Sequence, residues 1–221
     1  GFGFGLMGSS RQYKALLNLP GDELYPVKEG KPFNTFETIL RLRYAYQERT
    51  VDENFSRISF GSDFPIVELR YTHGWPGVFN SSYKYDKLDL SVSDYVNIAP
   101  YGSLYYNFFG GKAFGTEPYQ MLNIPPGNDW YVYSKYSFNL MTRFQYLTDQ
   151  YAGFSLEHNI GSGIFRYIKP TRKLKIRQFW EVKGLVGDLS DANKQLNFVA
   201  DTSFQTLNNK MYLEIGTGID N

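Results

Sequence analysis

Apolar and polar residues alternate along much of the chain with a period of two. In residues 136–146 (YSFNLMTRFQY), Phe138, Leu140 and Phe144 fall on one side of an extended chain, and Arg143 falls on the other. Successive side chains of a β-strand point to opposite faces of the sheet. The pattern therefore predicts strands that present one apolar face and one polar face.

The same alternation recurs from the first residues to the last, between loops rich in Gly, Pro, Asn and Asp. Helical periodicity is weak, and only residues 11–17 fit a short helical turn. We therefore predict an all-β fold that forms a single domain over residues 1–221. The alternation predicts strands at residues 2–7, 36–47, 55–60, 65–73, 83–93, 102–109, 130–146, 151–160, 173–186, 195–204 and 210–218.

At least six of these strands carry charged residues on one face and large apolar residues on the other. The charged faces carry Arg41, Arg43, Glu68, Arg70, Arg143, Glu157, Arg177, Glu181 and Lys183. The apolar faces carry Leu40, Leu42, Leu140, Phe144, Leu156, Ile176 and Val182. The two faces are thus expected to meet different surroundings.

Two architectures produce this pattern. A soluble β-sandwich buries the apolar face and turns the charged face to water. A transmembrane β-barrel turns the apolar face to lipid and the charged face to a wet lumen. Sandwich strands average ~5–6 residues, whereas a membrane-spanning strand needs ~9–11, and segments 36–46, 83–93, 136–146 and 174–184 are of the longer kind.

The placement of aromatic residues favours the barrel. The apolar faces of 36–46 and 136–146 carry aromatic residues at both ends and leucine nearer the centre, as lipid-facing barrel strands do. We therefore predict an antiparallel transmembrane β-barrel, in which the charged residues above line the lumen and the apolar residues face lipid. A soluble carbohydrate-binding β-sandwich is the alternative.

The composition of the chain argues against several classes of protein. The net charge is +1, which gives no electrostatic reason to expect nucleic acid as a partner. The chain has no cysteine, which excludes disulfides and cysteine-ligated metals, and it has no apolar run long enough for a transmembrane helix. The opening GFGFGLMG and the closing YLEIGTGIDN both continue the alternation, so we expect a barrel domain truncated at one or both ends, a fragment of a larger barrel.

Candidate catalytic and metal-binding chemistry is sparse. The two histidines, His73 and His158, lie far apart in sequence. Ser155 and Glu157 have the opposite parity to His158, which excludes a same-strand triad. Asp86 and Asp89 likewise point to opposite faces of one strand, which argues against a glycosidase pair. We predict no enzymatic activity, no cofactor and no metal.

The charges of the predicted lumen have two interpretations. An excess of cationic side chains would favour anionic solutes or bind a plug. Alternatively, the charges form a self-satisfying ion-pair network that closes the lumen, because desolvated charges require partners. The second interpretation is favoured. The small inward glycines of GFGFG and GTG would allow the strands to curve or admit a plug.

The stretch 104–193 contains a series of short marks in a fixed order: Gly110, Gly111, Lys112, Phe114, Gly115, Pro118, Tyr119, residues 138–141 (FNLM), Asp149, Tyr151, His158, Gly161, Phe165 and residues 173–178 (KLKIRQ). By these marks the stretch resembles a family of outer-membrane proteins from Bacteroidetes. Members of that family carry a carboxypeptidase-regulatory-like domain followed by a barrel domain of unknown function, distantly similar to the BamA-type assembly and translocation barrels. The regulatory-like domain, the terminal aromatic-ended strand and the Arg-Gly-Phe/Tyr loop motif of assembly factors are absent from this sequence.

The resemblance implies location and fold more firmly than activity. It implies a non-enzymatic barrel in the outer membrane of a Gram-negative cell, concerned with envelope assembly, export or ligand passage. Outer-membrane lipid and other envelope proteins are the expected partners. A solute channel or receptor of the outer membrane is an alternative function.

Overall fold

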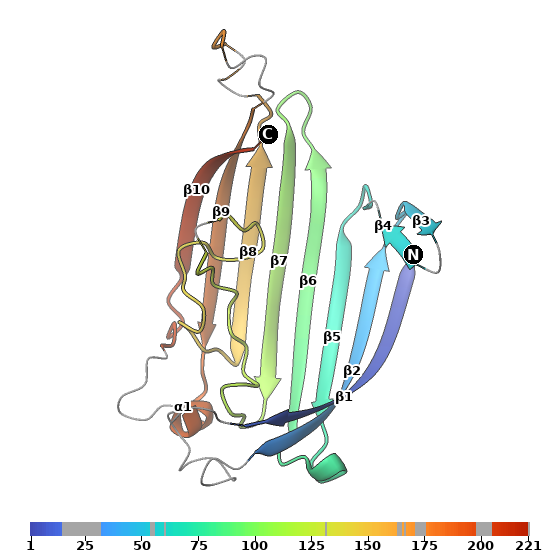
Figure 1. The fold of residues 1–221 in the computed structure, drawn as a ribbon, viewed down its shortest axis with the longest axis vertical. Helices are drawn as coiled ribbons and strands as arrows, with labels where there is room; N and C mark the ends of the chain where they lie inside the picture. Colours follow the sequence, from blue (N-terminus) through green and yellow to red (C-terminus); the bar gives the residue numbers. More distant parts are fainter. Residues whose placement is uncertain are drawn as a thin grey trace.

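Eight long strands form one antiparallel sheet (Figure 1). The computed structural model describes residues 1–14, 32–53, 56–59, 61–130, 132–162, 165, 167–170, 176–197 and 205–220. The strands of the large sheet are β1 (Phe2–Tyr13), β2 (Phe33–Ala45), β5 (Ile66–Gly74), β6 (Tyr85–Asn97), β7 (Ser103–Phe114), β8 (Gln150–Asn159), β9 (Arg177–Asp188) and β10 (Tyr212–Asp220), and they lie in that order. Strands β3 (Thr50–Glu53) and β4 (Ser56–Ser59) form a separate hairpin, Val78–Asn80 forms a 3-10 turn, and Asp191–Asn197 forms the helix α1.

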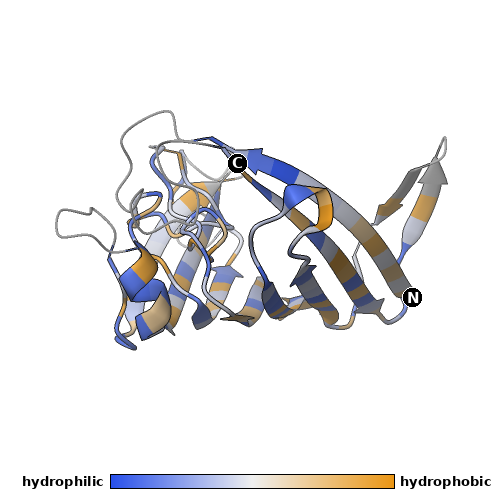
Figure 2. Ribbon diagram, turned by 90° about the horizontal axis from the view of Figure 1, so that it is seen from below, coloured by the Kyte–Doolittle hydropathy of each residue, from blue (hydrophilic) through white to orange (hydrophobic). Residues whose placement is uncertain are grey.

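The sheet curves into an open arc (Figure 2). Among the described residues, no strand pairs with the outer edge of β1 or of β10, so the expected closed barrel is not found. The coarser prediction, an all-β fold built on a large antiparallel sheet, is confirmed. Each strand pairs with the strand before it in the sheet order, as expected for a chain that turns back on itself at every loop.

Most of the predicted strands are present, and several are longer than the alternation indicated. The strand predicted at 2–7 continues to Tyr13, so residues 11–13 of the helical turn predicted at 11–17 are extended instead, and residues 15–17 lie outside the described residues. Residues 195–197 of the strand predicted at 195–204 are helical, and the rest lie outside the described residues. The prediction at 173–186 corresponds to β9, with residues 173–175 outside the described part.

The strand predicted at 130–146 is wrong. Residues 115–149, here called the internal segment, connect β7 to β8. Their described residues, which are all but residue 131, form no regular strand and only isolated bridges at Asn123, Gly127, Phe138, Tyr146 and Thr148. Phe138 and Met141 are 3% and 1% exposed, although the alternation places them on opposite faces. Both side chains are buried because the segment coils, so the parity of a strand does not apply to it.

The two faces of the sheet differ in what covers them. The internal segment packs on one face, here called the inner face, in front of β8, β9 and β10 (Figure 1). The opposite face, here called the outer face, carries the apolar residues of every strand. Large outer side chains exposed by more than a third include Phe4, Leu6, Tyr44, Tyr71, Leu88, Leu90, Phe108, Phe114, Trp180, Leu213, Ile215 and Ile219.

The buried apolar residues gather in three clusters, and each cluster contains residues of the internal segment. The first joins Met121 to Phe33, Tyr83 and Tyr85 at one end of the sheet. The second joins Phe138 and Met141 to Leu185 and Leu207, and the third joins Leu122 and Leu147 to Leu189. The packed core therefore lies between the internal segment and the sheet, and no described cluster lies on the outer face.

Helix α1 fixes both ends of the internal segment. Its Asn193 side chain is fully buried, accepts a hydrogen bond from the Glu117 backbone amide (2.8 Å) and donates one to Asp149 Oδ2 (2.8 Å). Asn197, also fully buried, donates to the Glu117 carbonyl oxygen (2.9 Å). Buried polar groups need such partners, so these bonds fix where the segment leaves β7 and where it enters β8.

Candidate functional site: the occupied inner face

The inner faces of β8, β9 and β10 carry three glutamates at adjacent positions. Glu157 on β8 lies opposite Glu181 on β9, and Glu214 on β10 lies opposite Lys183, two residues along β9 from Glu181. Glu181 and Glu214 are 4% and 2% exposed. Like charges placed opposite one another destabilise a sheet, so these carboxylates require donors from elsewhere.

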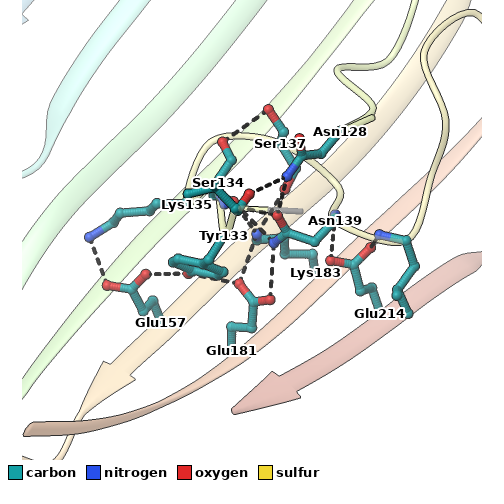
Figure 3. Close-up of polar contacts among 12 residues, drawn as sticks. Asn128, Tyr133, Ser134, Lys135, Ser137, Asn139, Glu157, Glu181, Lys183 and Glu214 are labelled. Atoms are coloured by element: carbon teal, nitrogen blue, oxygen red, sulfur yellow. Dashed lines mark hydrogen bonds and ion pairs between the residues drawn. The ribbon is translucent and has the colours of Figure 1, made fainter. Parts of the chain in front are cut away.

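The internal segment supplies those donors (Figure 3). The Tyr133 hydroxyl oxygen lies 2.6 Å from Glu157 Oε2 and 2.8 Å from Glu181 Oε2, so two carboxylates share one phenolic proton. Lys135 Nζ donates to Glu157 Oε1 (3.0 Å) and to the Tyr95 hydroxyl (2.8 Å). Burial, and then hydrogen bonding to the two carboxylates, raises the pKa of Tyr133 and keeps the phenol protonated.

Lys183 is the cation of the sheet at this site. Its Nζ lies 2.8 Å from Glu181 Oε2, and the two side chains are 3% and 4% exposed. It also donates to the backbone carbonyls of Ser134 (3.0 Å) and Ser137 (2.8 Å). A buried ammonium has three protons to satisfy, and here the three acceptors are one carboxylate and two carbonyls of the internal segment.

Glu214 holds the segment by its backbone. The amides of Asn139 and Leu140 donate to Glu214 Oε1 (2.7 Å) and Oε2 (2.9 Å), one to each oxygen. Asn139 Nδ2 also donates to Glu181 Oε1 (3.3 Å) and to the Ser134 carbonyl (3.1 Å). Hydrogen bonds to an ionised carboxylate are stronger than neutral ones, so this turn of the segment is fixed on β9 and β10.

A glycine on β10 leaves room for this arrangement. A Cβ atom added at Gly216 would lie 2.7 Å from Glu181 Oε1, closer than real side chains approach. Gly216 is the first glycine of the GTG motif, for which the sequence predicted small inward residues. A side chain at this position would displace the Glu181 carboxylate from its partners on the internal segment.

On β2 and β5 the inner-face charges pair without the internal segment. Arg41 Nη2 lies 2.7 Å from Glu68 Oε2, and Arg43 binds Glu48, in the loop after β2, through both Nη atoms (2.8 and 2.7 Å). Arg70 forms no ion pair with another described residue, although it lies opposite Asp89 in the register. A cavity of about 230 Å³ lies over these side chains.

The predicted site residues fall on the two faces as follows. Arg41, Arg43, Glu68, Arg70, Glu157, Glu181 and Lys183 lie on inner positions of strands, and Arg177 begins β9 with the same parity. Leu40, Leu42, Leu156 and Val182 lie on outer positions, and Ile176 directly precedes β9. The structure brings Glu157, Glu181 and Lys183 together around the internal segment.

Three predicted site residues belong to the internal segment instead of a strand. Leu140 and Phe144 are exposed by 75% and 54%, but they lie on no strand face. Arg143 Nε lies 3.8 Å from Asp129 Oδ2, and its backbone amide donates to Asp129 Oδ1 (2.9 Å). Their assignment to lumen and lipid by strand parity therefore has no basis in this structure.

The acid–base candidates lie as their parity indicated. His158 is on the outer face, where its Nε2 lies 2.9 Å from the Tyr101 carbonyl oxygen, whereas Ser155 and Glu157 are on the inner face. Asp86 lies 2.6 Å from His73 Nδ1 on the outer face, and Asp89 accepts a hydrogen bond from Tyr151 (2.7 Å) on the inner face. No group of three or more His, Asp or Glu residues suited to a metal occurs in the described part of the chain.

Glu117 is the most deeply buried acid of the internal segment. It is fully buried, and Lys87 Nζ lies 2.8 Å from its Oε2 while also donating to the Met121 carbonyl. Burial raises the pKa of Glu117 to about 7, and Lys87 offsets only part of that effect. The neighbouring carboxylates Asp149 and Glu37 raise it further.

Several residues of the site gave no recognisable sequence pattern. Tyr133, Glu117 and Asn193 act through contacts with residues distant in sequence, such as the 76 positions between Glu117 and Asn193. Glu214, in contrast, follows the alternation, because it falls on the polar face of a regular strand.

The fold and the site together define a class of protein: a large curved antiparallel sheet whose own connecting segment occupies its polar face. Residues 10–195 match the C-terminal domain of DUF5686, a family of unknown function, and the chain belongs to this family. No curated protein matches the chain. No helix in the described ranges is long and apolar enough to cross a membrane.

Replacement of Glu214 by glutamine should loosen the internal segment. The Asn139 and Leu140 backbone amides each donate to one oxygen of the Glu214 carboxylate. A glutamine side chain has only one acceptor oxygen, and its NH₂ group would face the other amide donor. Exchange of the Asn139 and Leu140 amide hydrogens should therefore accelerate about tenfold or more, the equivalent of ~1.4 kcal/mol. Hydrogen–deuterium exchange resolved by residue measures this change.

Glu68→Gln is the matched control, because Glu68 is an inner-face carboxylate that pairs with Arg41 and Arg43 within the sheet. It should leave the exchange of both amides unchanged. Equal exchange rates in the Glu214→Gln variant and the unchanged protein would show that Glu214 does not hold the segment.

Glu117 should make the stability depend on pH. Since its folded-state pKa is raised from 4.5 to about 7, the folded protein keeps a proton that the unfolded chain releases. This contribution is fully present below pH 4.5 and is lost as the pH rises through about 7, on the order of 3 kcal/mol in all. Urea unfolding from pH 4.5 to 8 should show the decline in the unchanged protein and a shallower profile in Glu117→Gln. Parallel profiles would contradict the assignment.

Proposed function

We propose that this protein is a non-enzymatic outer-membrane β-barrel protein of a Gram-negative cell. The eight strands cross the bilayer, the outer face meets lipid, and the inner face bounds a polar interior closed by residues 115–149. Its role is in envelope assembly, export or the passage of a ligand. The observation that carries the proposal is the apolar outer face, which has exposed large apolar side chains on seven of the eight strands, whereas Phe154 and Leu156 of β8 are half-buried.

Strand length supports the assignment to a membrane. The eight strands have 9 to 13 residues, and ~9–11 tilted residues cross the hydrocarbon core. Tyr44 and Trp180 lie on the outer face near one end of the sheet, and Phe36 and Phe114 lie near the other. Aromatic residues at both interfaces with aliphatic residues between them are typical of lipid-facing strands.

A soluble β-sandwich does not explain the exposed apolar side chains of the outer face well. It would cover the apolar face with a second sheet, but β3 and β4 are the only other strands described, and side chains such as Leu6, Leu90 and Ile215 remain 48–71% exposed. An uncovered apolar surface of this extent marks an interaction site or a membrane contact.

The free edges of the sheet require partners in such an environment. Hydrocarbon offers no hydrogen bonds to unpaired backbone groups, so spanning strands occur in closed barrels. We propose that the eight strands are part of a larger barrel, in which further strands pair with β1 and β10. The resemblance of residues 104–193 to outer-membrane barrels of Bacteroidetes supports this proposal.

The occupied interior favours export or assembly over steady solute flow. Tyr133, Lys135 and Asn139 fill the space in front of β8–β10 and engage Glu157 and Glu181. These inner carboxylates hold structure, which argues against a role for them in catalysis. Passage through this half of the interior would require the internal segment to move.

Cysteine labelling tests the membrane assignment, and the chain has no cysteine of its own. In proteoliposomes, a water-soluble maleimide should label Ser91→Cys, on the inner face, and should not label Leu90→Cys, its outer-face neighbour. A bimane attached at Leu90→Cys before reconstitution should be quenched by brominated lipids. Both variants should label in urea; rapid labelling of Leu90→Cys in intact proteoliposomes would remove the lipid contact.

Planar-bilayer conductance tests the closed interior. The Asn128 backbone amide donates to the Met141 carbonyl oxygen (2.8 Å), so the two residues that flank 129–140 lie next to each other. Residues 129–140 can therefore be replaced by two glycines. The full-length protein should show no steady conductance, and the excised variant should show stepwise conductance. Two glycines inserted after Asn128 without the excision should stay closed. Steady conductance of the unchanged protein would instead favour a solute channel.

A further inference from the structure

A cavity of about 230 Å³ lies between the internal segment and the inner faces of β7 and β8. Asn107 on β7 and Ser155 on β8 lie directly opposite one another in the register and contribute two polar side chains. Aromatic rings form much of the rest of the lining: Tyr105, Phe109 and Tyr151 from the sheet, and Tyr136 and Phe138 from the internal segment.

Two polar side chains of this cavity, Ser155 and Asn107, lack protein partners among the described residues. The Ser155 hydroxyl is buried without a hydrogen bond in the described structure, and the residue is 9% exposed. The Asn107 amide, which carries donors and an acceptor, makes no hydrogen bond with another described residue. Buried polar groups are nearly always hydrogen-bonded to protein, water or ligand, so the Ser155 hydroxyl is free to bond to a molecule in the cavity that it lines.

The charges at the cavity are already neutralised. Lys183 is bound by Glu181 and two carbonyl oxygens, and Lys135 is bound by Glu157 and the Tyr95 hydroxyl. An anionic ligand would compete with these partners, and a cationic ligand would meet two ammonium groups. The cavity therefore favours an uncharged molecule.

We propose that this cavity binds one neutral, polyhydroxylated ring, such as a single hexose unit. Pockets for drug-sized ligands hold ~300–1,000 Å³, so the smaller volume limits the ligand to about one ring. Hydroxyl groups of the ring satisfy Ser155 and Asn107, while the aromatic side chains cover its carbon–hydrogen faces. This inference goes beyond the proposed function, because it requires neither a membrane nor passage through the interior.

The purified full-length protein is titrated with methyl glycosides of glucose, galactose and N-acetylglucosamine in an amine-oxide detergent, which carries no sugar. Saturation-transfer NMR should show transfer to the ring protons of at least one glycoside. Cyclohexanol, a ring of the same size with a single hydroxyl, should bind at least tenfold more weakly.

Variants locate the binding. Ser155→Ala should weaken glycoside binding about three- to tenfold through loss of a hydrogen bond, and Asn107→Leu should weaken it further. Ser91→Ala is the matched control, because Ser91 lies on the same inner face but lines the neighbouring cavity. It should leave the affinity unchanged, and near-ultraviolet circular dichroism confirms that each variant is folded.

Three results would overturn the inference: no transfer to any glycoside at tens of millimolar, equal binding of cyclohexanol, or equal effects of Ser155→Ala and Ser91→Ala. The first two are read on the unchanged protein and do not depend on the folding of a variant. Each would leave the cysteine-labelling pattern unaffected, so a failure here is distinct from a failure of the membrane assignment.

Discussion

The ion pair between Glu181 and Lys183 is the contact on which the arrangement of the inner face depends. Its nitrogen and oxygen lie 2.8 Å apart, with both side chains almost fully buried. Two charges removed from water are costly unless further hydrogen bonds complete their shells. The remaining acceptors and donors all come from residues 133–139, so the pair is satisfied only while the internal segment lies on the sheet.

The docked internal segment also gives the protein its packed apolar core. A curved sheet with one apolar face and one charged face has no packed interior of its own. The internal segment provides it, because Met121, Leu122, Phe138, Met141 and Leu147 pack against apolar residues such as Phe33, Tyr85 and Leu185 and complete the three buried clusters. Folding of the sheet and docking of the segment are therefore expected to be coupled.

Alternation predicted the sheet well because strand parity is a local property. Leu40 and Arg41, or Leu156 and Glu157, separate onto opposite faces whatever their neighbours are. The same reasoning failed at 136–146, where the period of two is present but the chain coils. There the Asn139 and Leu140 amides bind Glu214, 75 and 74 positions away, and such distant partners override the local pattern. Glu214 itself lies on a regular strand, so alternation assigns it to the inner face. The turn that it binds could not be predicted in this way.

The cavity beside Ser155 connects the internal segment to the strands on which a ligand would rest. Tyr136 and Phe138 form part of its wall, and both belong to the turn fixed by Lys183 and Glu214. A molecule that occupies the cavity contacts the segment only in its docked position, since displacement of the segment removes that wall. By linkage, a ligand that binds one position better than another shifts the balance toward it. A ligand in the cavity would therefore hold the internal segment in its docked position and keep the interior closed. Any partner that displaces the internal segment would lower the affinity of the cavity for the proposed sugar ring.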